Sequence, residues 1–153
     1  MFAVVVLPES LQVDSRSPLF VAGRVWLEIA GHAFPETGWS DSPLSVLGSM
    51  GTAIHHALDD GEGDVYFFEG PYFMKVLLTE DGALRVVGVC DRHPAPDDGG
   101  VIEAEVTVPV HEVLDAYRNA VRSLRQWAQE RGEAEVLAVL ERMSELDEAC
   151  HDL

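Results

Sequence analysis

Basic residues are scarce in this chain. Its 153 residues contain 10 Lys and Arg against 27 Asp and Glu, which gives a formal net charge of −17. A surface of this sign repels phosphate groups, so we expect neither nucleic acid nor an anionic membrane as a partner. A basic protein would instead be attracted and steered towards the chain. The plain alternative is that the acidic residues only keep the protein soluble.

Cysteine and long apolar runs are also scarce. The two cysteines, Cys90 and Cys150, lie far apart in the sequence, which is typical of a reducing compartment and not of a disulfide framework. No apolar run approaches the roughly 20 residues that cross a bilayer. The apolar start, residues 1–7, lacks a basic segment and breaks at Pro8, so we interpret it as a strand and not as a signal peptide. These features predict a cytoplasmic protein.

Motifs of catalysis and of metal binding are missing as well. The sequence has no His-x-x-x-His or Cys-x-x-Cys pair, no Gly-x-Ser-x-Gly elbow, and no glycine-rich loop with a lysine to hold phosphate. The acidic segment 59–64 resembles a calcium loop, but an EF-hand frame from Asp60 places Pro71 where a bidentate glutamate is required. We therefore expect no cofactor, no metal ion and no enzymatic activity.

Apolar segments bounded by turn residues predict the strands. Hairpin-length connections between the last four predict an antiparallel sheet with one face wetter than the other. Segment 91–100, rich in proline and glycine, is expected to be a loop. The strands are expected at 2–7, 19–29, 33–34, 65–69, 72–79, 84–90 and 101–108.

Three helices complete the predicted fold. Apolar residues at helical spacing predict a helix over 43–58, inserted after the second or third strand, and Gly48 and Gly51 are expected to let it lie close against the sheet. Two more helices, which begin after Pro109 and after Gly132, are joined by a connection so short that they form an antiparallel hairpin. The sequence therefore predicts a single α+β domain over 1–153, with an antiparallel sheet of about five to six strands.

An acidic segment and the aromatic residues beside it are the candidate binding residues. Acidic side chains would steer a basic partner. Neighbouring side chains of a strand point to opposite faces, so Tyr66, Phe67 and Phe68 cannot all enter one core unless helices cover both faces. Exposed aromatic residues are favoured at interface centres. The predicted partner-binding residues are therefore Asp59, Asp60, Glu62, Asp64, Tyr66, Phe68, Asp97 and Asp98.

Three of the few basic residues share one helix face. Arg118, Arg122 and Arg125 are spaced three to four residues apart in the first helix of the C-terminal hairpin. They either pair with acids of the last helix or of the sheet face, or anchor an anionic patch on a partner or on a second subunit. Both alternatives stay open.

Two segments carry a resemblance to a known group of proteins. A strand ends in Ile29-Ala30-Gly31, then Phe34-Pro35 and Trp39-Ser40-Asp41 lead into a helix, and Phe68-Glu69-Gly70-Pro71-Tyr72 lies in a hairpin. In this order, with a long terminal helix, the chain resembles small uncharacterised bacterial proteins found among the immunity proteins of polymorphic toxin systems. The resemblance implies a non-enzymatic inhibitor that binds one toxin domain tightly, and it assigns no binding residue.

Three functions follow as hypotheses. The first is an acidic protein-binding module, in its most specific form an immunity-type inhibitor of a basic toxin. The second is a small-molecule-binding protein or minor enzyme, with a pocket between the sheet and helix 43–58 that is lined by the helix glycines and His55. The third is a structural homodimer, joined through the aromatic sheet face or the terminal helices.

Overall fold

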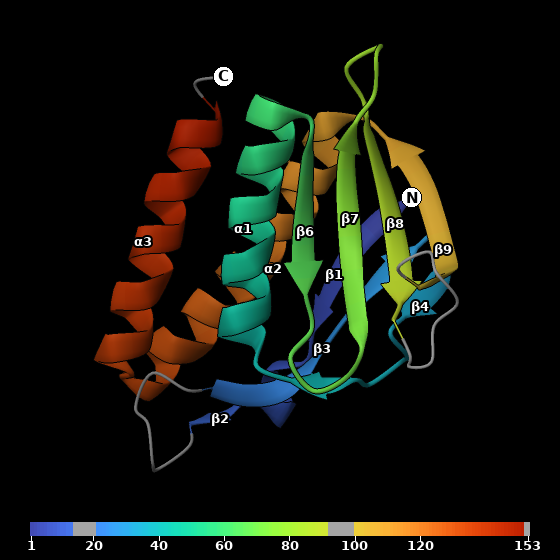
Figure 1. The fold of residues 1–153 in the computed structure, drawn as a ribbon. Coiled ribbons are helices and arrows are strands. Elements are labelled where there is room, and N and C mark those ends of the chain that lie inside the picture. Colours follow the sequence, from blue (N-terminus) through green and yellow to red (C-terminus); the bar gives the residue numbers. More distant parts are fainter. Residues whose placement is uncertain (14–20, 92–99, 152–153) are drawn as a thin grey trace.

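The computed structural model describes residues 1–13, 21–91 and 100–151, and the side chains of the last helix as far as Met143. In these ranges the chain is an α+β structure with two antiparallel sheets, of five and four strands, and three α-helices (Figure 1). The predicted class, the antiparallel strands, the inserted helix and the C-terminal helix pair are confirmed. The strands are divided between two sheets, because the first long strand takes its partners from the N-terminal third of the chain.

One long strand organises the first sheet. Every second residue of this strand faces the core, and Val25, Leu27 and Ile29 are fully buried, as the alternation predicts. A short 3-10 helix, η1 (Pro8–Ser10), follows the first strand. The central strand β3 (Val21–Ile29) pairs with β1 (Phe2–Val6), β2 (Gln12–Val13), β4 (His32–Phe34) and β5 (Ser40–Asp41).

The second sheet is a meander in chain order. Its strands are β6 (Glu62–Tyr66), β7 (Tyr72–Leu78), β8 (Leu84–Cys90) and β9 (Val101–Val108), so β6 and β9 form its edges. The first of these strands begins and ends three residues before the predicted range. The reason is Gly61, which ends the preceding helix at a φ of 98° and turns the chain directly into the strand.

The helices pack against both sheets, the first beside β6 and the second against β1. They are α1 (Pro43–Asp60), α2 (Val110–Arg131) and α3 (Ala134–His151), and Figure 1 shows α1 between α3 and β6. Gly132 separates α2 from α3 with a φ of 66°, the left-handed conformation that the sequence predicts there. No helix in the described ranges combines the length and the apolar character needed to span a bilayer.

The glycines of α1 face other helices, which corrects the expectation that they let the helix approach the sheet. A Cβ atom on Gly51 would lie 2.7 Å from the hydroxyl oxygen of Tyr117 in α2, and one on Gly48 would lie 3.5 Å from the terminal carbon of Met143 in α3. The close contact between helix and sheet is made instead by Gly63 of β6. A Cβ atom there would overlap the carbonyl group of Ala53.

One hydrophobic cluster joins both sheets to all three helices within the described residues. Leu27 of β3, Met50 of α1, Met74 of β7, Leu124 of α2 and Leu140 of α3 are all members, and each is fully buried. Because α1 and β6 touch this core with only one face each, their opposite faces are left at the surface.

Candidate functional site

The two segments that carry the sequence resemblance meet in space. The ring of Phe34 packs edge-on against Phe67 and Tyr72, with centroid distances of 5.9 and 5.7 Å. Trp39 packs edge-on against Tyr72 at 5.2 Å. Such edge-to-face pairs are favourable beyond the area that they bury. These motif residues therefore join the segment after β4 to the connection between β6 and β7.

A buried carboxylate holds this junction together. Asp41 is only 4% exposed, and its Oδ2 accepts hydrogen bonds from Trp39 Nε1 at 3.0 Å, Phe68 N at 2.9 Å and Glu69 N at 3.2 Å. Its Oδ1 accepts a fourth bond from Ser42 N at 2.7 Å. A buried carboxylate is stable where donors surround it in this way. Asp41 therefore has a structural role, and it positions the backbone of Phe68.

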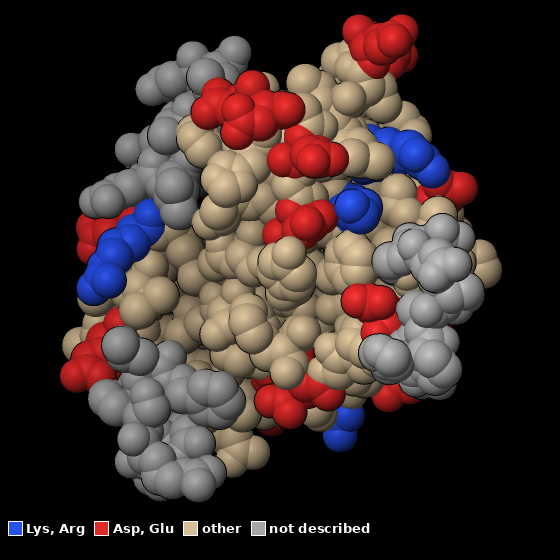
Figure 2. Space-filling view, in the orientation of Figure 1, with Lys and Arg blue, Asp and Glu red and all other residues tan. Residues whose placement is uncertain are grey.

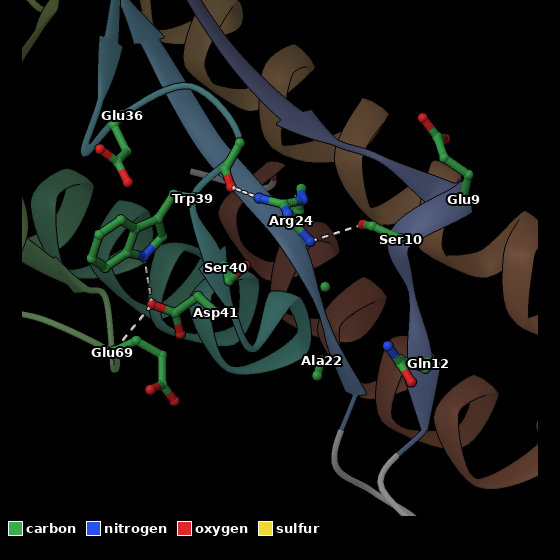
Figure 3. Close-up of a pocket in the computed structure, with 12 residues that line it drawn as sticks. Glu9, Ser10, Gln12, Ala22, Arg24, Glu36, Trp39, Ser40, Asp41 and Glu69 are labelled. Carbon is green, nitrogen blue, oxygen red and sulfur yellow. Dashed lines mark hydrogen bonds between the residues drawn. The ribbon is translucent and has the colours of Figure 1, made fainter.

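An open hollow of about 840 Å³ lies in front of Asp41 (Figure 3). The Arg24 side chain projects into it and donates a hydrogen bond to the carbonyl oxygen of Gly38, and the backbone N–H of Arg24 donates to Ser10 Oγ at 2.9 Å. Arg24 and Asp41, the two charged groups at the centre of the hollow, are thus hydrogen-bonded to other protein atoms. We therefore interpret the hollow as a structural junction. Three glutamates line it as well: Glu9, Glu36 and Glu69.

Six of the eight predicted binding residues lie together at the end of α1 and along β6. Asp59 and Asp60 are exposed in the last turn of α1. The side chains of β6 alternate, so its even-numbered residues face solvent and its odd-numbered residues face the core. Figure 2 shows acidic side chains following this end of α1 and β6. The exposed members are Asp59, Asp60, Glu62, Asp64, Tyr66 and Phe68. The other two, Asp97 and Asp98, lie outside the described residues.

Tyr66 is in direct contact with one of the charges of this surface. The hydroxyl group of Tyr66 donates to Asp64 Oδ2 at 3.4 Å. The negative charge of Asp64 raises the pKa of Tyr66 above its usual value of 10.0, with smaller contributions from burial and from this hydrogen bond. Tyr66 also lies 6.3 Å from the ring of Phe73, over which the amine of Lys75 lies at 5.9 Å.

A groove of about 570 Å³ runs between α1 and β6, and we call it the α1–β6 groove. Its strand side is formed by Glu62, Gly63, Asp64 and Tyr66, with Phe68 beyond them. Its helix side is formed by small or polar residues: Ser45, Gly48, Ser49, Thr52, Ala53 and His56.

The small-molecule hypothesis expects a pocket in this region with a different lining. It places His55 there together with both helix glycines. His56 lines the groove instead, while His55 Nε2 lies 3.4 Å from Asp59 Oδ2 on the same helix. Gly48 lines the groove, but Gly51 is buried against α2. The reason is helical geometry, since neighbouring residues on a helix diverge by about 100°.

The remaining sequence candidates are placed as follows. Among the described residues, no three His, Cys, Asp or Glu side chains are grouped to hold a metal ion. On α2, a guanidinium nitrogen of Arg118 lies 3.9 Å from Asp115 Oδ1, and Arg122 donates to Asn119 Oδ1 at 3.1 Å. These contacts lie within α2 itself.

The helix side of the groove escaped the sequence analysis. Ser45, Ser49, Thr52 and His56 recur at intervals of four, three and four residues, which is the spacing of one helix face. That face is the polar counterpart of the apolar stripe, and small polar residues on an exposed face are ordinary. This spacing indicates a groove only when β6 is known to lie beside that face of the helix.

The predicted binding residues and the groove form one continuous surface, which we call the α1–β6 surface. It comprises the six exposed residues between Asp59 and Phe68 and the groove residues of α1. Comparison of the chain with protein-family models, with curated proteins and with solved structures finds no match.

Proposed function

We propose that this protein is a non-catalytic module that binds a cationic protein through the α1–β6 surface. The observation that carries the proposal is the exposure of two large aromatic side chains, Tyr66 at 51% and Phe68 at 57%, beside four exposed carboxylates. An exposed aromatic ring offers a large contact area at a low entropic cost, which is why such rings are enriched in interface centres. The carboxylates would attract a basic partner and raise its association rate.

In its most specific form the proposed module is an immunity-type inhibitor that covers the basic surface of a toxin domain. Such an inhibitor must associate quickly and needs no chemistry of its own. A nuclease is one fitting target, because the surface that holds its substrate's phosphates is cationic. The acidic residues would then steer the encounter, and Tyr66 and Phe68 would provide the contacts that slow dissociation.

The experiment that tests the inhibitor begins with the proteins encoded beside this chain's gene. Each is expressed alone and together with the chain, and growth and complex formation are measured. We expect one neighbour to be toxic alone and harmless when the chain binds it. If no neighbouring product is toxic or forms a complex, the inhibitor form of the proposal is wrong.

Two variants with equal charge then test the surface. The site variant replaces four acids of the α1–β6 surface, and the remote variant replaces four exposed acids elsewhere, so each removes four negative charges. We expect the site variant to associate about tenfold more slowly at low salt, with a flatter salt dependence. An association rate equal to that of the remote variant would exclude the α1–β6 surface as the site that attracts the partner. The site variant carries Asp59→Ser, Asp60→Ser, Glu62→Ser and Asp64→Ser. The remote variant carries Glu80→Ser, Glu103→Ser, Glu135→Ser and Glu141→Ser.

A further inference from the structure

We propose that the cationic partner also covers an apolar row on the open face of the second sheet, which runs from Tyr66 on β6 to Ile102 on β9. This inference rests on the proposed function, because it extends the contact of the same partner and sets the orientation of that partner. It is carried by the register of the four strands, by the exposure of the row at both ends, and by the distribution of charge beside it.

Four apolar side chains lie in one line across the sheet. The register places Tyr66 opposite Phe73, Phe73 opposite Val89, and Val89 opposite Ile102. Residues directly opposite one another in a sheet point to the same face. We call Tyr66, Phe73, Val89 and Ile102 the apolar row. With a spacing of about 4.8 Å between neighbouring strands, the row is about 14 Å long.

No helix covers this face of the sheet in the part of the chain that the structure describes (Figure 1). The helix α1 packs against the opposite face, since it is the odd-numbered residues of β6 that contact it. Tyr66 and Ile102 are each more than half exposed, while Phe73 is partly buried and Val89 is almost covered. The row therefore reaches the surface at both ends, and apolar side chains join these ends.

Exposed apolar side chains gather at this row. Phe68, two residues after one end, and Val101, next to the other end, are exposed as well. Elsewhere in the described ranges, the large apolar side chains that are exposed are those of Met1 and Leu78. Figure 2 looks onto this face and shows a tan area bordered by acidic side chains. The solvent side of an antiparallel sheet is ordinarily polar, and a contiguous exposed apolar patch marks an interaction site.

The charges beside the row are distributed unevenly. The acids of the α1–β6 surface lie beside its β6 end, where Glu62 and Asp64 are exposed. Further across the face, Arg85 Nη2 lies 2.5 Å from Glu105 Oε2, and the amine of Lys75 lies over an aromatic ring of the row. The carboxylates that can attract a basic partner are therefore concentrated at the β6 end.

Charge and apolar area together select the occupant. A second copy of this chain would bring another net charge of −17 against the acids at β6, and an anionic membrane is repelled in the same way. A cationic protein is attracted, and its contact with Tyr66 continues along the row where it presents apolar side chains next to its basic ones. The partner that fits therefore places its basic residues over β6 and its apolar residues towards β9.

The test uses short synthetic peptides, blocked at both ends, and the full chain labelled with nitrogen-15. The first peptide has two lysines, a glycine and two leucines, and its extended length of about 17 Å spans the row. In the second peptide serines replace the leucines, and in the third glutamates replace the lysines. We expect the first to bind saturably and about tenfold more tightly than the second, and the third not to saturate. Amide shifts caused only by the first peptide should cluster at Val89 and Ile102.

Two variants of the protein locate the leucines of the first peptide. Ile102→Ser removes an apolar end of the row, and Leu78→Ser removes an exposed aliphatic side chain from the far end of β7. Both positions are exposed, so circular dichroism should show that both variants are folded. We expect only Ile102→Ser to weaken binding of the leucine peptide, by about fivefold, and neither variant to change binding of the serine peptide.

Each contrary result identifies the claim that is wrong. The apolar row is excluded if the leucine peptide does not saturate or binds no better than the serine peptide, or if Ile102→Ser leaves its affinity unchanged. The proposed function still stands in that case if the site variant alone loses binding of the lysine peptides. Equal binding of these peptides to the site and remote variants would overturn the proposed function itself. A dimer of the parent that sedimentation detects and that Ile102→Ser dissociates would assign the row to a second copy, and would overturn the inference.

Discussion

A single carboxylate links the core to the proposed interface. Asp41 accepts backbone hydrogen bonds from Phe68 and Glu69, residues 27 and 28 positions further along the chain. It thereby sets where the Phe68 side chain leaves the sheet, next to Tyr66. The Asp41 carboxylate is buried and surrounded by donors. Its removal would leave those donors without an acceptor and would release the segment that carries the exposed ring of Phe68.

We expect Asp41→Ala to lower the free energy of unfolding by about 3 kcal/mol, because it removes a charged acceptor shared by several buried donors. Urea unfolding measures this difference. Asp60→Ala serves as the control, since Asp60 is exposed at the end of α1 and should change stability by less than about 0.5 kcal/mol. Equal stabilities of the two variants would contradict the role given to Asp41.

The pKa of Tyr66 reports the electrostatics of the surface directly. Its hydroxyl group faces Asp64, whose charge disfavours the phenolate and raises the pKa above 10.0. Asp64→Asn should therefore lower the pKa of Tyr66, which is measured by ultraviolet titration of the phenolate, with Tyr66→Phe used to assign the transition. The control Glu80→Gln, on the loop after β7, should leave it unchanged. An unaltered titration in Asp64→Asn would exclude the contact.

Local pattern predicted some residues of the site and not others. The alternation of β6 was enough to indicate that Tyr66 and Phe68 share a face and that Phe67 does not. The full role of Asp41 could not be predicted, because two of its four hydrogen-bond donors, Phe68 N and Glu69 N, come from a distant segment that no local spacing connects to it. The helix side of the groove could not be predicted for the same reason, since Ser49 and Thr52 line a groove only because β6 lies beside them.

At the scale of elements, periodicity predicted the helices and strands. The packing of these elements determined the division into sheets and the contacts of the helix glycines. The strand predicted at 19–29 appears as β3 from Val21 to Ile29, with residues 19 and 20 outside the described ranges, and the helix predicted at 43–58 extends two residues further, to Asp60. The division into two sheets was not predictable, because it depends on which strands β3 recruits. Of the two glycines of α1, Gly51 is a site of close contact, but its partner is α2 and not the sheet, and Gly48 makes only ordinary contact with α3.

The two glycines of α1 should respond differently to alanine. Gly48→Ala should stabilise the protein by about 0.5–1 kcal/mol, because a Cβ there meets only ordinary contact and alanine favours the helix. Gly51→Ala should destabilise it by about 1–3 kcal/mol, because the added carbon would press on Tyr117. Thermal and urea unfolding of the two variants provide the measurement, and each variant is the control for the other. Stabilisation by both would show that α1 and α2 are not tightly packed at Gly51.

At the scale of the whole molecule, the dominant feature is a net charge of −17. Like charges repel one another across the folded surface, and the unfolded chain relieves this repulsion by expanding. The α1–β6 surface concentrates part of this charge at the C-terminal end of α1, where the helix dipole makes acids unfavourable. A cationic partner would neutralise these negative charges, so the electrostatic repulsion within the free protein favours formation of the complex.

Salt should therefore stabilise the free protein. Raising NaCl from about 20 mM to about 200 mM shortens the screening length from about 20 Å to about 7 Å, so we expect the melting temperature to rise by several degrees. Potassium chloride should have the same effect, because the effect depends on screening and not on a bound ion. The remote variant should show a smaller rise. A melting temperature that falls with salt would mean that favourable ion pairs outweigh the repulsion.

The same field predicts that the proposed function limits stability. The site variant loses four clustered acids, two of them at the end of α1, so its free energy of unfolding at low salt should exceed that of the parent by about 1 kcal/mol. Its association with a cationic partner should weaken in the same experiment. The remote variant loses equal charge from scattered positions, and it should gain less stability and keep its affinity. If the site variant is less stable than the parent, these acids support the fold, and their proposed role in recognition loses its energetic basis.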